Sequence, residues 1–216
     1  MYPWDRIQTV GVFGDHNPAL VAKAAHEGAK FAVSNDPGAV IDPETSNATV
    51  RSTWVKSAVA AAQAVNATGI NIDHEATMVK DSPQSALLSS VMVDLGEALR
   101  EAIPGAELSF DAAARPCYEH RCYNYSAIAA AVDWMFVMDY DLNDFDDPPP
   151  DNDHSRANAP LPAVEAGLKQ LIAAGVPPEK IVCGLPWYGY VYLLTKKGIV
   201  LVSGFAVRSL HSSFII

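Results

Sequence analysis

Short apolar runs alternate with longer amphipathic stretches from the start of the chain to about residue 190. Short runs of this kind are typical of buried strands, whereas apolar positions repeating every three or four residues are typical of helices. The strand-like runs are Thr9–Phe13, Lys30–Val33, Gly69–Asp73, Glu107–Phe110, Trp134–Tyr140 and Ile181–Leu185. The helical patterns are Pro18–Gly28, Val50–Val65, Pro83–Ile103, Ser126–Val132 and Leu161–Ala174. The order predicts an α/β fold with a parallel sheet covered by helices.

Proline and glycine fall where helices are expected to begin and end. Pro18 and Pro83 stand at the start of helical patterns, where proline is tolerated because the first N–H groups of a helix have no partner within it. Gly28 and Gly175 follow two of the patterns, at positions typical of C-terminal caps. These residues support the predicted boundaries.

A parallel sheet of this kind can be open and doubly wound, or closed into a barrel. The chain has no G-x-G-x-x-G and no G-x-x-x-x-G-K-[ST] motif, so an open nucleotide-binding sheet loses its main support. A barrel carries its chemistry at the C-terminal ends of its strands. The polar residues Asp73, Glu75, Asp111, Tyr140 and Asp141 all fall there. We therefore expect a (β/α)8 TIM-barrel type of fold.

Only six strand–helix units are readable, whereas a full barrel has eight. The sequence thus predicts a partial catalytic barrel over residues 1–192. The remainder, residues 193–216, is apolar and serine-rich without acidic residues, and we expect an aberrant or poorly structured tail, although Ile199–Val202 could form a strand. The stretch Asp144–Asp153, rich in aspartate and proline, is predicted to be a solvated loop.

Charge and hydropathy exclude several classes of function. The formal net charge is −10, and a nucleic-acid groove needs a clustered basic surface, so no nucleic-acid partner is expected. No stretch approaches the roughly 20 apolar residues that cross a bilayer, so no membrane partner is expected. The first residues lack an apolar run after a basic start, so we read no signal peptide in this sequence.

The three cysteines leave the redox compartment open. Cys117 and Cys122 are close enough in sequence to close a small loop, and Cys183 lies in an apolar run typical of a buried thiol. Three Asn-x-Ser/Thr acceptors occur at Asn47, Asn66 and Asn124. They carry glycan only if the chain enters the secretory path.

The most informative segment runs from Gly69 to Glu75. Successive side chains of a strand alternate between faces, so Asn71, Asp73 and Glu75 share one face and His74 lies on the other, as a core or helix-packing residue. Burial of three polar groups without partners would cost roughly 1–3 kcal/mol each. A catalytic site is therefore the more economical interpretation than a structural strand.

The pair Asp73 and Glu75 suits the cleavage of a glycosidic bond. A general acid must hold its proton near the working pH, and a neighbouring carboxylate raises its pKa by repulsion. The second carboxylate can stabilise positive charge as the bond breaks. A metal at Asp73, His74 and Glu75 is not expected, because adjacent strand residues point apart and no H-E-x-x-H spacing is present.

The same segment resembles the catalytic strand of family 18 glycoside hydrolases, D-G-x-D-x-D-x-E. The chain matches it at Gly69, Asp73 and Glu75, and departs from it with Thr68 at the first aspartate and Asn71 at the second. With asparagine at this position the segment is similar to the catalytic strand of one subgroup, the di-N-acetylchitobiases. Further segments resemble that subgroup: Trp4–Val10, Arg121–Ser126, Phe136–Asp141 and Gly184–Tyr190.

The resemblance implies hydrolysis of N-acetylglucosamine oligosaccharides by a substrate-assisted, retaining mechanism without a cofactor. It implies that Glu75 protonates the leaving oxygen and that Asp73 stabilises the oxazolinium formed by the 2-acetamido group of the sugar. Met138, Tyr140 and Asp141 match the family's M-x-Y-D motif, which holds that acetamido group in place.

Other candidate substrate contacts are Asn71 and Asp111 at strand ends, and Trp187 and Tyr188 as faces for stacking sugars. The resemblance also implies a lysosomal or extracellular location, and the subgroup acts on the chitobiose core of N-glycans. The family's first and last strands are missing from the pattern. The alternative is therefore a catalytically weak or inactive chitooligosaccharide-binding or truncated product.

Overall fold

A computed structural model describes residues 3–14, 17–142, 157–195, 198–206 and 213–215. Strands and helices alternate along the first part of the chain in the predicted order, and each observed element overlaps its predicted run. In chain order they are β1 (Thr9–Val12), α1 (Pro18–Glu27), β2 (Lys30–Asn35), α2 (Ala48–Ala64), β3 (Gly69–Ile72), α3 (Pro83–Ala102), β4 (Glu107–Ala113), α4 (Tyr125–Ala131), β5 (Trp134–Met138), α5 (Leu161–Ala173) and β6 (Ile181–Cys183).

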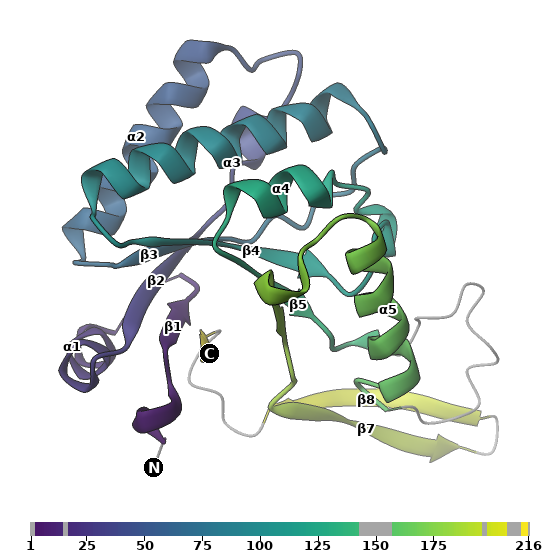
Figure 1. Cartoon of the computed structure of the whole chain (residues 1–216). Helices are drawn as coiled ribbons and strands as arrows, with labels where there is room; N and C mark the ends of the chain where they lie inside the picture. The colour runs from purple at the N-terminus through teal and green to yellow at the C-terminus, as the bar shows by residue number, and fades with distance from the viewer. Residues whose placement is uncertain (1–2, 15–16, 143–156, 196–197, 207–212, 216) are drawn as a thin grey trace.

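The strands form one curved sheet in the order β6-β5-β4-β3-β2-β1-β9. Strands β1 to β6 are parallel, and the short β9 (Ser213–Ile215) pairs antiparallel with β1. Helices α2, α3 and α4 cover the convex side of the curve (Figure 1). Within the described residues the sheet has two ends, β6 and β9, and does not close. The predicted barrel type, with six strand–helix units, is confirmed as a half-barrel.

The main core lies between the central strands and the helices. Ile70 and Ile72 of β3 and Leu108 of β4 are fully buried, in one cluster with Leu95 and Leu99 of α3. Because side chains alternate along a strand, this packing commits the remaining side chains of β3 and β4 to the opposite face. The core therefore orients the polar residues of these two strands.

The predicted boundary signals are confirmed in the backbone. Pro18 and Pro83 begin α1 and α3. Gly28 ends α1 in the left-handed conformation with φ of 77°, and Gly175 follows α5 with φ of 94°. A side chain at either position would be strained, because L-residues rarely adopt such φ values.

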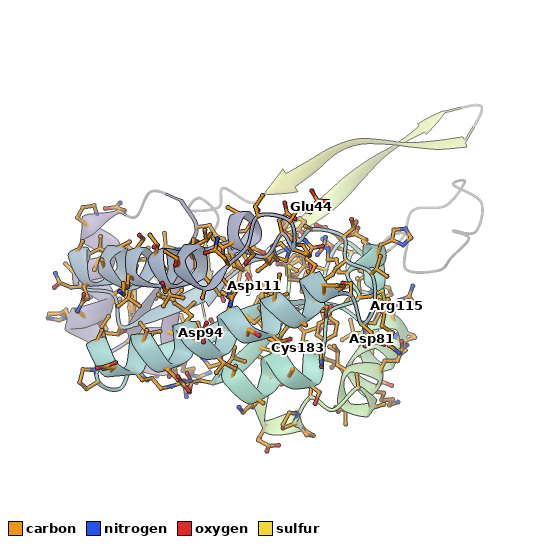
Figure 2. All side chains as sticks on the ribbon, turned by 90° about the horizontal axis from the view of Figure 1, so that it is seen from above. Glu44, Asp81, Asp94, Asp111, Arg115 and Cys183 are labelled. Atoms are coloured by element: carbon orange, nitrogen blue, oxygen red, sulfur yellow. A yellow bond between two sulfur atoms is a disulfide. The ribbon has the colours of Figure 1, made fainter. Side chains whose placement is uncertain are left out.

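The C-terminal part departs from the strand–helix alternation. Strands β7 (Tyr188–Thr195) and β8 (Gly198–Ala206) pair antiparallel in a hairpin that stands away from the main sheet in both views (Figures 1 and 2). The proposed boundary at residue 192 falls within β7, and Ile199–Val202 lies within β8. Part of the expected irregular tail is thus paired, because its β-branched and aromatic residues favour strands. The loop expected at 144–153 lies outside the described residues.

No helix in the described part of the chain combines the length and the apolar character that a membrane span requires.

Candidate active site

A buried hydrogen-bonded cluster joins the polar faces of β3 and β4. The Ser109 hydroxyl donates to Asn71 Oδ1 at 2.7 Å, and Asn71 Nδ2 donates to Asp111 Oδ2 at 2.9 Å. All three residues are buried. The strands can approach closely at their base because position 69 is glycine: a Cβ there would lie 2.8 Å from the carbonyl oxygen of Glu107. Both polar atoms of the Asn71 amide therefore have partners, so its burial does not carry the cost of an unsatisfied polar group.

Asp73 follows β3 directly and continues its pairing, since its N–H donates to the carbonyl of Asn35 at 3.0 Å. Its Oδ1 is buried and has no hydrogen-bond partner among the described residues. Burial raises the pKa of Asp73 to about 6, with further contributions from the negative charges of Glu75 and Asp36; Arg121 acts in the opposite direction. The carboxyl is thus poised to change charge in mildly acidic solution.

Glu75 reaches solvent and is paired with an arginine. Its Oε2 lies 2.6 Å from Nη1 of Arg121; the Glu75 side chain is 47% exposed, whereas that of Arg121 is 14% exposed. Arg121 also contacts the carboxylate of Glu119. Glu75 is more exposed than Asn71 on β3, since it lies three residues past Ile72, the last residue of the strand. An accessible carboxyl is what a proton donor to a bound sugar requires.

The loop after β3 is braced by the loop that carries Arg121. The Tyr123 hydroxyl lies 2.8 and 2.7 Å from the carbonyl oxygens of His74 and Ala76, to which it donates. Met78 pairs with the same loop, since its N–H donates to the carbonyl of His120 at 2.8 Å. These bonds fix the backbone on both sides of Glu75.

A disulfide closes the loop that delivers Arg121. Cys117 and Cys122 are bonded, as their spacing allowed, and three residues in the loop have positive φ: Cys117, Glu119 and His120. Non-glycine residues adopt such φ values at a cost, and cross-linking makes this geometry easier to maintain. The constraint holds Arg121 in the position from which it reaches Glu75.

His74 lies on the opposite side of the segment, as alternation predicted. Its side chain is buried, its Nδ1 lies 2.7 Å from Asp36 Oδ1, and its ring is tilted against Tyr123 at 5.7 Å between centroids. Asp36 follows the end of β2. His74 is therefore a core residue that ties the loop after β3 to the end of β2.

The end of β5 brings a tyrosine to the carboxyl cluster. The pKa of Tyr140 is raised, first by burial and then by the negative charges of Asp111, Asp73 and Glu75. Its ring makes an edge contact with that of Tyr188 at 6.3 Å between centroids. The structure thus places Tyr140 within electrostatic range of the three carboxyl groups that the sequence analysis singled out.

Met138 and Asp141 flank Tyr140. Met138 is the last residue of β5 and is half-buried. Asp141 is exposed and has a positive φ of 58°, and its N–H donates to Asn158 Oδ1 at 2.6 Å. The chain therefore turns sharply at the end of the motif.

Trp187 lies outside this cluster. Its side chain is 81% exposed in the described structure, whereas its neighbour Tyr188 is half-buried against Tyr140. The two aromatic residues proposed as sugar contacts are thus in different environments. Tyr188 packs against Tyr140, and the ring of Trp187 is exposed.

A further buried carboxyl, Asp139, was not singled out in the sequence. It accepts a hydrogen bond from Cys183 Sγ at 3.0 Å, and burial raises its pKa to about 6. Cys183 itself is exposed, so the expectation of a buried thiol is wrong. The strand β6 that carries it is an edge of the sheet in the described residues and has no neighbour beyond it to cover this position.

Sequence reasoning also missed the partners of the central carboxyls. Arg121 and Asp36 lie in loops, where neither alternation nor spacing would select them, whereas Ser109 shares the face of Asp111 on β4 and alternation could have found it. Arg121 opens a segment noted for its resemblance to the family, and that was the one available signal for it.

The described residues contain no group of three or more His, Cys, Asp or Glu arranged to hold a metal ion. What the site offers is acid–base chemistry: one accessible carboxyl paired with an arginine, and one half-buried carboxyl with a pKa of about 6 two residues before it. Carboxyl groups whose surroundings differ in this way can take different roles in one reaction.

The chain is a half-barrel of the (β/α)8 type with carboxyl groups at the ends of its strands, and comparison with known proteins gives the family. Residues 22–205 match the family described as glycosyl hydrolases family 18. The chain therefore belongs to glycosyl hydrolase family 18.

Similar curated proteins include two mammalian enzymes. The di-N-acetylchitobiase of Rattus norvegicus is 35% identical over 201 residues, which cover 89% of this chain and 51% of that protein. The di-N-acetylchitobiase of Homo sapiens is 32% identical, with 88% and 48% covered. The chain thus spans about half the length of these relatives.

Solved structures agree on the fold. A putative sporulation-specific glycosylase of Bacillus subtilis has a TM-score of 0.67 at 20% identity, covering 88% of this chain and 64% of that one. A chitinase of Rhizomucor miehei has a TM-score of 0.66 at 18% identity, covering 97% and 76%.

Proposed function

We propose that this protein hydrolyses β-1,4 linkages in N-acetylglucosamine oligosaccharides, including the chitobiose core of N-glycans. The observation that carries the proposal is the asymmetry of two carboxyls: Glu75 is accessible, and Asp73 is partly buried with one oxygen unpaired. The similarity to di-N-acetylchitobiases supports the choice of substrate.

In the proposed reaction Glu75 protonates the glycosidic oxygen, and the bond to the anomeric carbon breaks. The carbonyl oxygen of the sugar's own 2-acetamido group attacks that carbon from the other side, so that an oxazolinium ion forms. Water then opens the ion, with Glu75 as the base that takes the proton, and the configuration is retained.

Asp73 stabilises the positive charge of the oxazolinium. A carboxylate with few hydrogen-bond partners in a poorly solvated position attracts a nearby cation more strongly than a carboxylate in water does. Arg121 offsets the charge that Glu75 acquires once its proton has left, because the guanidinium is already in contact with Oε2.

Tyr140 holds the acetamido group, together with Asp141 and Met138, and Asn71 and Asp111 form the floor below it. Tyr188 and Trp187 supply aromatic faces for the sugar rings. The reaction needs no cofactor. A lysosomal or extracellular location, where such oligosaccharides are released, completes the proposal.

The test is hydrolysis of a fluorogenic chitobioside by the purified chain and by Glu75→Gln. The glutamine keeps the size of the side chain but cannot donate the proton, so turnover should fall by about 100-fold or more. Glu119→Gln is the matched control, because Glu119 contacts the same arginine and is also exposed; its turnover should stay within a few-fold of the parent.

A second candidate is binding of chitooligosaccharides without turnover. The observation that favours it is the open site: Trp187 is 81% exposed and the sheet does not close within the described residues. Saturable sugar binding, with equal background hydrolysis by the parent and Glu75→Gln, would support binding alone and contradict the enzyme.

A further inference from the structure

Asp111 and Asp73 are lateral neighbours on parallel strands. The pairing of β3 with β4 places Asn71 beside Ser109 and Ile72 beside Phe110. Continued by one residue, this register brings Asp73 beside Asp111, and the charge of Asp73 acts on the pKa of Asp111. Adjacent strands are about 4.8 Å apart, and residues beside each other on parallel strands point to the same face. Both carboxyls therefore face the concave side of the sheet. In Figure 2 Asp111 lies well inside the outline of the molecule, and it is only 2% exposed.

The cluster below them fixes the orientation of Asp111. The Ser109 hydroxyl donates to Asn71 Oδ1, which turns the amide so that Nδ2 points to Asp111. Nδ2 is a donor, so Asp111 Oδ2 must act as the acceptor. The other oxygen of Asp111 is left to face something else.

Two unpaired oxygens remain in this place. Asp111 Oδ1 and Asp73 Oδ1 are both buried, and neither has a hydrogen-bond partner among the described residues. A buried polar atom without a partner costs roughly 1–3 kcal/mol, so two in adjacent positions call for a common explanation.

Both carboxyls have raised pKa values, and burial is the largest cause in each. Burial raises the pKa of Asp111 well above its ordinary value, and the charges of Asp73 and Glu75 raise it further, although the bond from Asn71 opposes them. The pKa of Asp73 is raised to about 6. Two half-buried or buried carboxyls in adjacent positions favour keeping one proton between them, and the deeper burial of Asp111 favours its place there. Since Oδ2 of Asp111 accepts from Asn71, Oδ1 is the oxygen that would carry a proton on Asp111.

We propose that Asp111 is a positioning residue for Asp73, which donates a hydrogen bond from its protonated Oδ1 to the Asp73 carboxylate. Asn71 stands where the family pattern has its second aspartate. Asp111, on the neighbouring strand β4, supplies a carboxyl group near Asp73 that Asn71 cannot supply. The inference rests on the proposed function in one respect: Asp73 is the group that stabilises the sugar cation.

Other charged groups also act on Asp73 and set the background for a test. Glu75 and Asp36 are anions on the segments that follow β3 and β2, and both raise the pKa of Asp73, whereas Arg121 lowers it. Tyr140, at the end of β5, is near the same carboxyls. None of these groups is altered by a substitution at Asp111, so the effect of that substitution is separable.

The experiment is a carbon-13 NMR titration of side-chain carboxyls in the full chain, with the Asp73 signal assigned by its loss in Asp73→Asn. A hydrogen bond to a carboxylate favours its ionised form, so Asp111→Val should raise the pKa of Asp73 by about 1. Asp111→Asn keeps a neutral donor beside Asp73 and an acceptor for Asn71, so the pKa of Asp73 should stay at its parent value.

Three results would overturn the proposal. One is an unchanged or lowered pKa of Asp73 in Asp111→Val, since an ionised Asp111 would repel Asp73. Another is a rise in Asp111→Asn as large as in Asp111→Val. The third is an Asp111 signal that titrates, in the unmodified protein, at the same pH as the Asp73 signal or at a lower one. This last measurement decides the question even if Asp111→Val does not fold.

Ser109→Ala is the control for a general disturbance of the cluster. It removes one hydrogen bond from Asn71 but no group beside Asp73, so the Asp73 titration should hold; a shift as large as that of Asp111→Val would also contradict the proposal. The titration needs no turnover. Its outcome is therefore distinguishable from a failure of the chain to hydrolyse chitobiosides.

Discussion

Two regions of the molecule differ in how deeply their polar and aromatic side chains are buried. One is the pair of strands β3 and β4, and the other is the aromatic segment around Trp187. On β3 and β4 the polar residues are buried, bonded to each other and backed by a core of Ile70, Ile72 and Leu108. Trp187 is 81% exposed at the end of the sheet. The acid–base part of the site is thus built by strand pairing, whereas the proposed sugar platform depends on surroundings that these residues do not provide.

The largest expected difference between the two regions is in stability. Leu108 is fully buried beside the polar cluster, and Leu108→Ala leaves a cavity, so unfolding should become easier by about 3 kcal/mol. Chemical denaturation followed by circular dichroism measures the change. A loss under about 1 kcal/mol would show that the strands are not tightly packed and would remove the contrast.

Asp73→Asn should stabilise the protein at neutral pH. The pKa of Asp73 is about 6 in the folded protein against an ordinary 3.8, so ionisation favours the unfolded chain. Stability from this group is full below about pH 4, falls between pH 4 and 6, and is lost above pH 6. At pH 7 the asparagine should therefore add up to about 2 kcal/mol to the free energy of unfolding, a figure reduced for the solvent that reaches this half-buried carboxyl. Below pH 4 it should add nothing.

Asp133→Asn is the contrasting control for that prediction. Asp133 Oδ2 accepts hydrogen bonds from the N–H of Leu108 at 2.8 Å and from Arg100 at 3.0 Å, so the folded structure stabilises its ionised form. The Asp133→Asn variant should therefore not be more stable than the parent at pH 7. Thermal melts of both variants at pH 4 and pH 7 give the comparison, and equal behaviour of the two would contradict the special environment of Asp73.

Arg121→Gln should have a smaller effect, of about 1 kcal/mol. It removes the contacts with Glu75 and Glu119, but both carboxylates are about half exposed and partly screened by solvent. The loss should shrink as salt is added. Urea melts at low and high ionic strength measure it, and a loss that does not depend on salt would point to packing of the arginine stem instead.

Trp187→Ala should change stability least, by less than about 0.5 kcal/mol, because so little of the ring is buried. If the ring stacks on a sugar, affinity for chitooligosaccharides should still fall about tenfold, as titration calorimetry would show. A large loss of stability would mean that the aromatic end packs as firmly as β3 and β4. An unchanged affinity would remove Trp187 from the proposed site.

Much of the fold follows from local chemistry that can be read along the chain. The alternation of apolar runs and helical patterns predicted six parallel strands, and Gly28, Gly175, Pro18 and Pro83 marked helix boundaries that the backbone confirms. The hairpin of β7 and β8 was only partly foreseen, because strand pairing between segments of similar apolar character leaves no distinctive period in the sequence.

The candidate site divides in the same way. Two-residue alternation was enough to separate Asn71 and Asp73 from His74, because side-chain direction along a strand is a local property. It did not indicate how exposed each residue is: Glu75 is 47% exposed, because it lies past the end of β3, where no neighbouring strand covers it in the described pairing. The side of a strand can be read from the sequence, but its last residue cannot.

By itself the sequence determined the order of the elements, the face on which the carboxyls lie and the resemblance to family 18. Only the tertiary structure decided who their partners are: Arg121 beside Glu75, Asp36 beside His74, and Asp111 within range of the Asp73 charge. The physical reason is distance along the chain. These pairs are 38 to 46 residues apart, and the parallel register that joins them arises from packing of the whole sheet against its helices.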